Sequence, residues 1–119
     1  MKRTKLVTKS GLAIALATGL AVGLSAPCRA DDTAKVYADN CASCHGPQGK
    51  GDGPAAAALT PPPGSFAQSI AGKSDDWIFK GIKEGGPGVG KALSMPPYAG
   101  TLSDDQIKAM VAYVKQLQK

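Results

Sequence analysis

The stretch Cys41-Ala42-Ser43-Cys44-His45 (CASCH) places two thiols and an imidazole within five residues, and His45 is the only histidine of the chain. The pattern C-x-x-C-H is the attachment site of c-type haem. Two thiols at this spacing reach two vinyl groups on one porphyrin edge and form thioethers. The adjacent imidazole then becomes the proximal ligand of the iron. The stretch therefore predicts one covalent haem c held by Cys41, Cys44 and His45.

Two other uses of closely spaced thiols fit the sequence poorly. A thioredoxin-like dithiol requires a βαβ context, and no run with strand periodicity is present. A structural zinc site requires four ligands, and no Cys or His after Cys28 adds to the three of CASCH. The sequence therefore favours haem attachment over both alternatives.

The residues around CASCH predict short helices and long loops. A helix capped by Asp32 or Thr33 is expected to run to Asn40, with Val36 and Tyr37 on its apolar side. The segment 46–63 is rich in Gly and Pro, so it cannot form a long regular element.

Two further helices follow in the second half of the chain. One is capped by Ser74, carries Trp77, Ile78 and Ile82, and is expected to stop at Gly85-Gly86-Pro87. The other opens on a capping box from Ser103 to Gln106, and an apolar stripe follows: Ile107, Met110, Val111, Val114 and Leu117. The sequence predicts a small, all-α, loop-rich fold.

Met95 is the candidate for the second iron ligand. It lies in the loop Ser94-Met95-Pro96-Pro97-Tyr98, where two prolines restrict the backbone and no helical set of apolar partners surrounds it. Met110, in contrast, belongs to the apolar stripe of the last helix, so we expect it in the core. A Met/His ligand pair raises the reduction potential of a haem iron.

The first thirty residues have the order of a secretory signal peptide. A basic segment, 1–10, precedes the apolar run 11–24, and the short segment 25–30 ends in Ala30. The apolar run would rise only about 21 Å as a helix, less than the ~30 Å hydrocarbon core, which disfavours a membrane span. We expect cleavage after Ala30 and a mature domain of residues 31–119. Lipid attachment at Cys28 is the minor alternative.

The charge of the chain does not point to nucleic acid. The formal net charge is +5, but all nine acidic residues and nine lysines lie from Asp31 onward, so this part is neutral. The excess of positive charge belongs to the segment expected to be removed.

From Thr33 to Leu117 the chain resembles the class I c-type cytochromes, small monohaem electron carriers of bacteria. The resemblance rests on NCASCHGPQGKGDGP, the proline-rich TPPP, the SMPPY segment and the final helix LSDDQIKAMVAYV. It implies crossed N- and C-terminal helices with a haem crevice between loops, and it implies that a carbonyl of Pro61, Pro62 or Pro63 accepts the Nδ1–H of His45. One departure is Thr33, where the family usually has Gly for close helix crossing.

The resulting functional expectation is a periplasmic one-electron carrier with His45 and Met95 as axial ligands. It would work as a monomer with transient redox partners, a donor and an acceptor, and it would not be an enzyme. A haem subunit docked on a larger oxidoreductase is the main alternative. A haem sensor or a peroxidase would need an open iron site, and no second histidine is present to serve a peroxidase.

Overall fold

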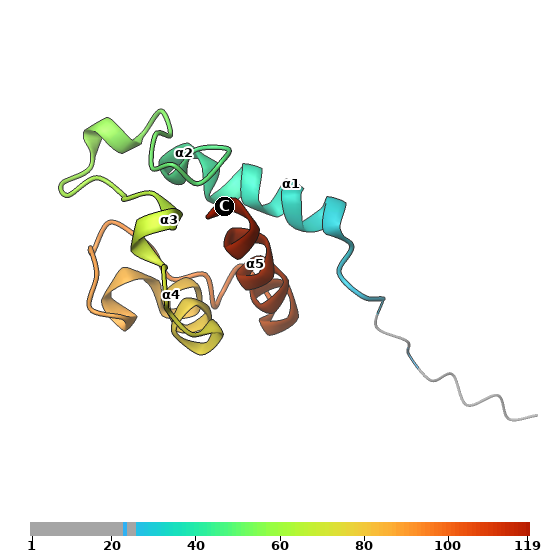
Figure 1. Ribbon diagram of the computed structural model, residues 1–119. Helices are drawn as coiled ribbons and strands as arrows, with labels where there is room; N and C mark the ends of the chain where they lie inside the picture. The colour runs from blue at the N-terminus through green and yellow to red at the C-terminus, as the bar shows by residue number, and fades with distance from the viewer. Residues whose placement is uncertain (1–22, 24–25) are drawn as a thin grey trace, which may run out of the picture.

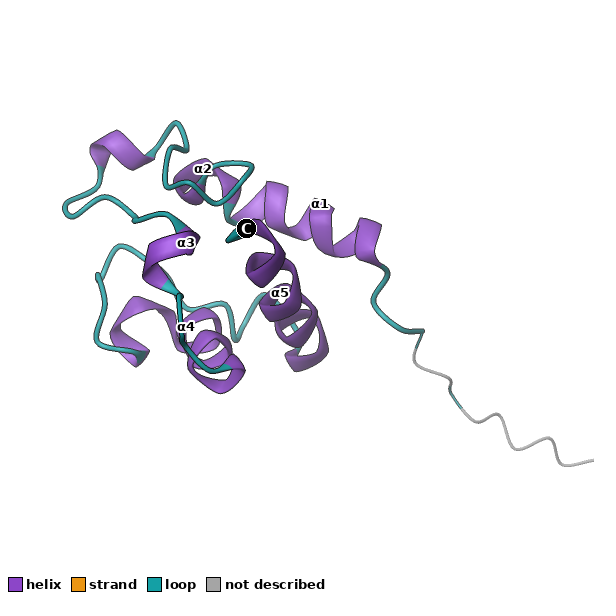
Figure 2. Cartoon of the chain, viewed as in Figure 1, coloured by secondary structure: helices purple, strands orange, loops and turns teal. Residues whose placement is uncertain are grey.

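The computed structural model describes residue 23 and residues 26–119, so most of the expected signal peptide, residues 1–22 and 24–25, lies outside the described residues. The described part is helical and contains no strand, as expected (Figures 1 and 2). Its elements are α1 (Ala30–Asn40), α2 (Ala42–His45), the 3₁₀ turn η1 (Ala56–Ala58), α3 (Phe66–Ser69), α4 (Asp75–Gly88) and α5 (Asp104–Leu117). None of the described helices is long and apolar enough to cross a membrane.

Helix α1 begins earlier than the sequence predicted. Arg29, rather than Asp32 or Thr33, is the N-cap, and Asp31 and Asp32 occupy the first turn. Acidic side chains in a first turn interact favourably with the positive end of the helix dipole, which accounts for the longer helix. Thr33 is instead buried at 5% exposure, and its hydroxyl donates a hydrogen bond to the Arg29 carbonyl.

Helices α1 and α5 pack against each other, as the resemblance implied (Figure 1). The rings of Tyr37 and Tyr113 meet in this contact, with 5.2 Å between their centroids. Helix α4 packs on another side of α5. The apolar stripe of α5 is thus covered by two helices, and its residues Ile107, Met110, Val111 and Val114 are all buried.

Helix α4 differs from its expected end. The sequence predicted a stop at Gly85-Gly86-Pro87, but one more helical turn follows and reaches Gly88. The helix is interrupted at Gly85, whose φ of 78° and ψ of −177° are not helical. Glycine tolerates this positive φ at little cost because it has no Cβ atom. The break turns the chain towards the loop that carries Met95.

The capping box predicted at the start of α5 is present. The Ser103 hydroxyl accepts from the Gln106 amide at 3.2 Å, and the Gln106 side-chain oxygen accepts from the Ser103 amide at 2.9 Å. Each bond satisfies an amide that the helix itself leaves without a partner.

We expect Ser103→Ala to lower the free energy of unfolding by about 1 kcal/mol, because the first turn of α5 loses its acceptor. Chemical denaturation of the haem-loaded protein, followed by circular dichroism, measures the loss. Ser65→Ala is the matched control, since Ser65 is the N-cap of α3 but its side chain makes no capping bond. Equal losses in the two variants would contradict the capping role of Ser103.

Candidate functional site

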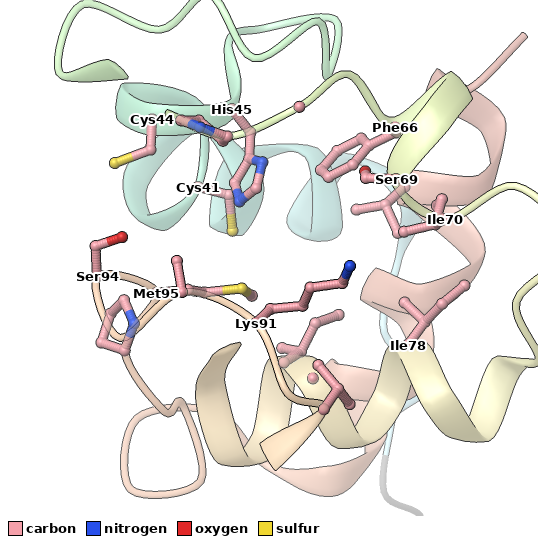
Figure 3. A pocket seen from close by; sticks show the side chains of 18 of the residues that line it. Cys41, Cys44, His45, Phe66, Ser69, Ile70, Ile78, Lys91, Ser94 and Met95 are labelled. Atoms are coloured by element: carbon pink, nitrogen blue, oxygen red, sulfur yellow. The ribbon is translucent and has the colours of Figure 1, made fainter. Parts of the chain in front are cut away.

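The residues singled out in the sequence meet at one cavity of about 310 Å³. Cys41, Cys44, His45 and Met95 all line it. Figure 3 shows Cys41 and His45 entering from the side of α2, and Met95 from the opposite side, with its sulfur towards them. The walls between these residues are mostly apolar: Leu59, Pro61, Pro62, Pro63, Phe66, Ile70, Trp77, Ile78, Ile82, Val89, Met110 and Val114.

The loop after CASCH holds α2 in place by pairing its last carbonyls. The amides of Gly51, Gly53 and Ala55 donate to the carbonyls of His45, Cys44 and Ser43, at 2.8, 3.2 and 2.8 Å. These carbonyls have no partner within so short a helix. A Cβ atom at Gly53 would collide with the Ser43 carbonyl oxygen, so the close approach requires glycine. The glycines of this loop therefore serve to fix the orientation of His45.

Tyr37 fixes the end of α2 to α1. Its hydroxyl is buried and donates to the Gly46 carbonyl at 2.6 Å. Burial raises the pKa of Tyr37 well above its ordinary value, so the hydroxyl remains a neutral donor. The hydrogen bond joins the helix before CASCH to the residue directly after it.

The Phe66 ring packs against the His45 imidazole. The two rings stack with 4.8 Å between their centroids and 27° between their planes. Burial lowers the pKa of His45, which favours the neutral imidazole that can bind a metal. Its Nδ1 is buried and has no hydrogen-bond partner among the described residues. The bond expected from a carbonyl of Pro61–Pro63 is therefore not formed, although all three prolines line the cavity.

The two thiols differ in their surroundings. Burial, with a smaller contribution from Cys44, raises the pKa of the Cys41 thiol to about 11. Cys41 is therefore protonated at neutral pH. Figure 3 shows the sulfur of Cys41 directed into the cavity and that of Cys44 directed towards the end where Ser94 lies.

The Met95 loop is fastened to α4 by backbone hydrogen bonds and close packing. The Gly86 amide donates to the Met95 carbonyl at 3.0 Å, and the Tyr98 amide donates to the Ile82 carbonyl at 3.1 Å. A Cβ atom at Gly85 would lie 2.6 Å from the Met95 carbonyl oxygen, and one at Gly86 would collide with the Ala92 carbonyl. The segment that follows the break in α4 is thus fixed in place.

Tyr98 also joins the Met95 loop to the other side of the cavity. Its hydroxyl donates to the Asn40 carbonyl, at the end of α1, over 2.7 Å. Burial raises the pKa of Tyr98, so this hydroxyl too is a neutral donor. Nothing in the sequence pattern around Tyr98 indicated this bond, which spans 58 positions.

Met110 borders the same cavity, but from within the core. It lies on α5, is 1% exposed and belongs to the cluster of buried apolar residues. Met95 is only partly buried and lies on the loop that faces α2. The structure thus agrees with the expectation that Met110 is a core residue.

The residues at the cavity fit a haem better than a bare metal ion. No group of three or more His, Cys, Asp and Glu side chains that could hold an ion occurs in the described part of the chain. The His45 imidazole lines the cavity, and its lowered pKa favours the neutral form, in which a ring nitrogen can bind iron. Apolar walls, two thiols and a neutral imidazole are what a covalently bound porphyrin requires.

Comparison with known proteins places these features in a family. The cytochrome c family model matches residues 30–118. The chain is 31% identical over 99 residues to the Cbb3-type cytochrome c oxidase subunit FixPc of Rhizobium leguminosarum bv. viciae. That match covers 83% of this chain but only 31% of the relative's length.

Two solved structures are also similar. The c-type cytochrome KustC0563 superposes with a TM-score of 0.55 and 30% identity, covering 73% of this chain and 98% of its own. A chain of the Kuenenia stuttgartiensis reducing HAO-like protein complex Kustc0457/Kustc0458 gives a TM-score of 0.60 and 26% identity, over 78% of this chain and 47% of its own. Members of the family bind covalent haem c and transfer electrons through its iron. This chain belongs to the cytochrome c family, as a class I c-type cytochrome.

Proposed function

We propose that the protein is an exported one-electron carrier in which Cys41 and Cys44 attach the haem and His45 and Met95 are its axial ligands. The main support is that an imidazole and a thioether reach one apolar cavity from opposite sides, and that both thiols open on the same cavity. Haem c supplies an iron that alternates between the ferrous and ferric states and so carries one electron at a time.

The chain's own residues would hold the ligands in one arrangement in both states. Phe66 and the loop after CASCH restrict the His45 ring, while Gly86 and Tyr98 restrict the Met95 loop. A thioether is a soft ligand that favours ferrous iron and raises the reduction potential. The mostly apolar walls would limit the access of water and small polar reactants to a bound haem, which suits transfer of electrons rather than conversion of a substrate.

The surface beside the ligands supports a contact with redox partners. Leu93, two residues before Met95, is 87% exposed, and Pro96 and Pro97 are exposed as well. On the other side of the cavity Ser43, between the two thiols, is exposed. Transient redox interfaces are small, so this rim is sufficient for a short-lived complex with a donor or an acceptor.

We propose that residues 1–30 export the protein to the periplasm and are then removed. Support comes from the basic, apolar and small-residue segments of the sequence, and from the haem itself, which exported apoproteins acquire outside the cytoplasm. The shorter mature domain would begin at the first turn of α1.

The alternative that it serves as a subunit of a larger complex is favoured by the names of two relatives. One is a subunit of a cytochrome c oxidase, and another is part of a reducing HAO-like protein complex. This chain spans less than a third of the first and about half of the second, so their assemblies are proposals for it.

Intact mass spectrometry tests the attachment and the export together. We expect the periplasmic protein to have the mass of residues 31–119 plus one haem, unchanged by a thiol reductant, because thioethers are not reducible. Cys44→Ala should leave the haem on one thioether or abolish maturation, while Cys28→Ala should not change haem content. A mass that includes residues 1–30, or haem released by the reductant, would contradict the proposal.

Substitution of the two methionines tests the axial ligand. Met95→Ala should remove the red-end absorption band of a ferric Met–iron bond, lower the reduction potential and permit the ferrous protein to bind carbon monoxide. The matched control, Met110→Leu, conserves apolar volume and should cost less than about 1.5 kcal/mol of stability with an unchanged iron spectrum. Carbon monoxide binding by the unmodified ferrous protein would instead favour a haem sensor or peroxidase.

Size-exclusion chromatography of periplasmic extract distinguishes the free carrier from the docked subunit. The carrier proposal predicts that the haem signal of this chain elutes as a monomer at physiological salt, because transient redox complexes dissociate on dilution. Elution with a larger oxidoreductase that survives dilution and high salt would support the subunit alternative.

A further inference from the structure

The haem cavity contains one strongly basic side chain, that of Lys91. Of the residues that line the cavity, no other is Lys, Arg, Asp or Glu. Lys91 also takes part in no ion pair within the described part of the chain, whereas Lys35, Lys80, Lys83, Lys108 and Lys115 each pair with an acidic residue. Lys91 is exposed to solvent, but it is the one cation among the residues that line these mostly apolar walls, so it is available to pair with an anionic group bound in the cavity.

The position of Lys91 within the cavity is defined by its backbone. Its amide donates to the Gly86 carbonyl at 2.8 Å, close to the bond between Gly86 and Met95. From there the side chain extends across the cavity, and Figure 3 shows its ammonium at the end where Ser69 and Ile70 lie. Cys44 and Ser94 lie at the opposite end.

A bound haem would present different substituents to these two ends of the cavity. The vinyl groups that form thioethers and the two propionates are on opposite edges of the porphyrin. If Cys41 and Cys44 hold the vinyl edge, the propionates are directed towards the end that the Lys91 ammonium occupies. We propose that Lys91 pairs with a haem propionate and keeps it ionised, an inference that rests on the proposed haem attachment.

The other polar groups of the cavity are less able to take this role. The hydroxyls of Tyr37 and Tyr98 already donate to backbone carbonyls, and the amide nitrogen of Asn40 donates to the Val36 carbonyl. The remaining titratable groups facing the cavity are Cys41, Cys44 and His45, which the proposed function assigns to the haem. Ser69 and Trp77 could add neutral hydrogen bonds but no charge.

Lys73 is a cation near the cavity that provides a matched control. Its ammonium lies 5.0 Å from the centroid of the Trp77 ring, and Trp77 lines the cavity, but Lys73 itself does not. Lys73→Gln thus removes one positive charge from the neighbourhood without removing a partner from inside the cavity.

The test is the reduction potential of the matured haem protein, measured from mildly acidic to mildly alkaline pH. With Lys91 present the paired propionate stays ionised, so it adds no pH dependence to the potential, and any slope that remains comes from the second propionate. An opposite charge within contact distance shifts a carboxyl pKa by about one unit or more, so Lys91→Gln should raise the proton affinity of the propionate at least tenfold. Protonation removes negative charge beside the iron and disfavours the ferric state. The potential of Lys91→Gln should therefore rise more steeply than that of the unmodified protein as the pH falls, and it should lie below it at alkaline pH.

Two companion variants make the result specific. Lys91→Arg keeps the charge and should keep the pH profile of the unmodified protein, whereas Lys73→Gln should lower the potential equally at every pH. A profile of Lys91→Gln that is parallel to that of Lys73→Gln would overturn the proposal. The proposed function would still stand in that case, provided that the ferric Met–iron band is unchanged, so the two failures are distinguishable.

Carbon-13 NMR of the unmodified protein, with labelled propionate carboxyl carbons, tests the same pairing without any variant. The proposal predicts that one carboxyl resonance does not titrate across the same pH range. Two propionates that both titrate within the range would overturn it, even if Lys91→Gln failed to mature.

Discussion

The close approach of the Met95 loop to α4 is the steric constraint on which the cavity depends. Gly85 and Gly86 lack the Cβ atoms that would collide with the carbonyls of Met95 and Ala92. Without this approach the Met95 carbonyl could not accept from the Gly86 amide, and the loop could not lie opposite α2. Gly85 and Gly86 thus determine where the Met95 loop forms the wall opposite α2. The thioether on that wall is the side chain of Met95 itself.

The cavity also shapes the stability of the fold. The domain is small, and its cluster of buried apolar residues, most of them on α1, α3, α4 and α5, lies around an interior space. A ligand that fills this space and binds only the folded state stabilises the fold by mass action. The hydrogen bonds of Tyr37 and Tyr98 to backbone carbonyls link the walls of the cavity in advance, which limits the rearrangement that binding requires.

The sequence was most informative where a residue type has one chemical role. The thiols and imidazole of CASCH, the apolar stripe of α5 and the capping box at Ser103 were all predicted, because each has a fixed spacing that does not depend on distant residues. The hydrogen bond between Tyr98 and Asn40 and the position of Lys91 were not predicted, since both depend on how separate segments fold together. The break of α4 at Gly85 was predicted, but the further helical turn that reaches Gly88 was not.

The proposed function depends above all on an iron-bound porphyrin that lies between His45 and Met95. Proton NMR of the ferrous haem protein, with the methionine methyl groups labelled with carbon-13, is a direct test, because the porphyrin ring current acts most strongly on a methyl directly above the iron. We expect one methyl resonance shifted far upfield, assigned to Met95, and a Met110 methyl much closer to its ordinary position. An ordinary resonance for Met95, or an extreme one for Met110, would show that the axial ligand has been assigned to the wrong residue.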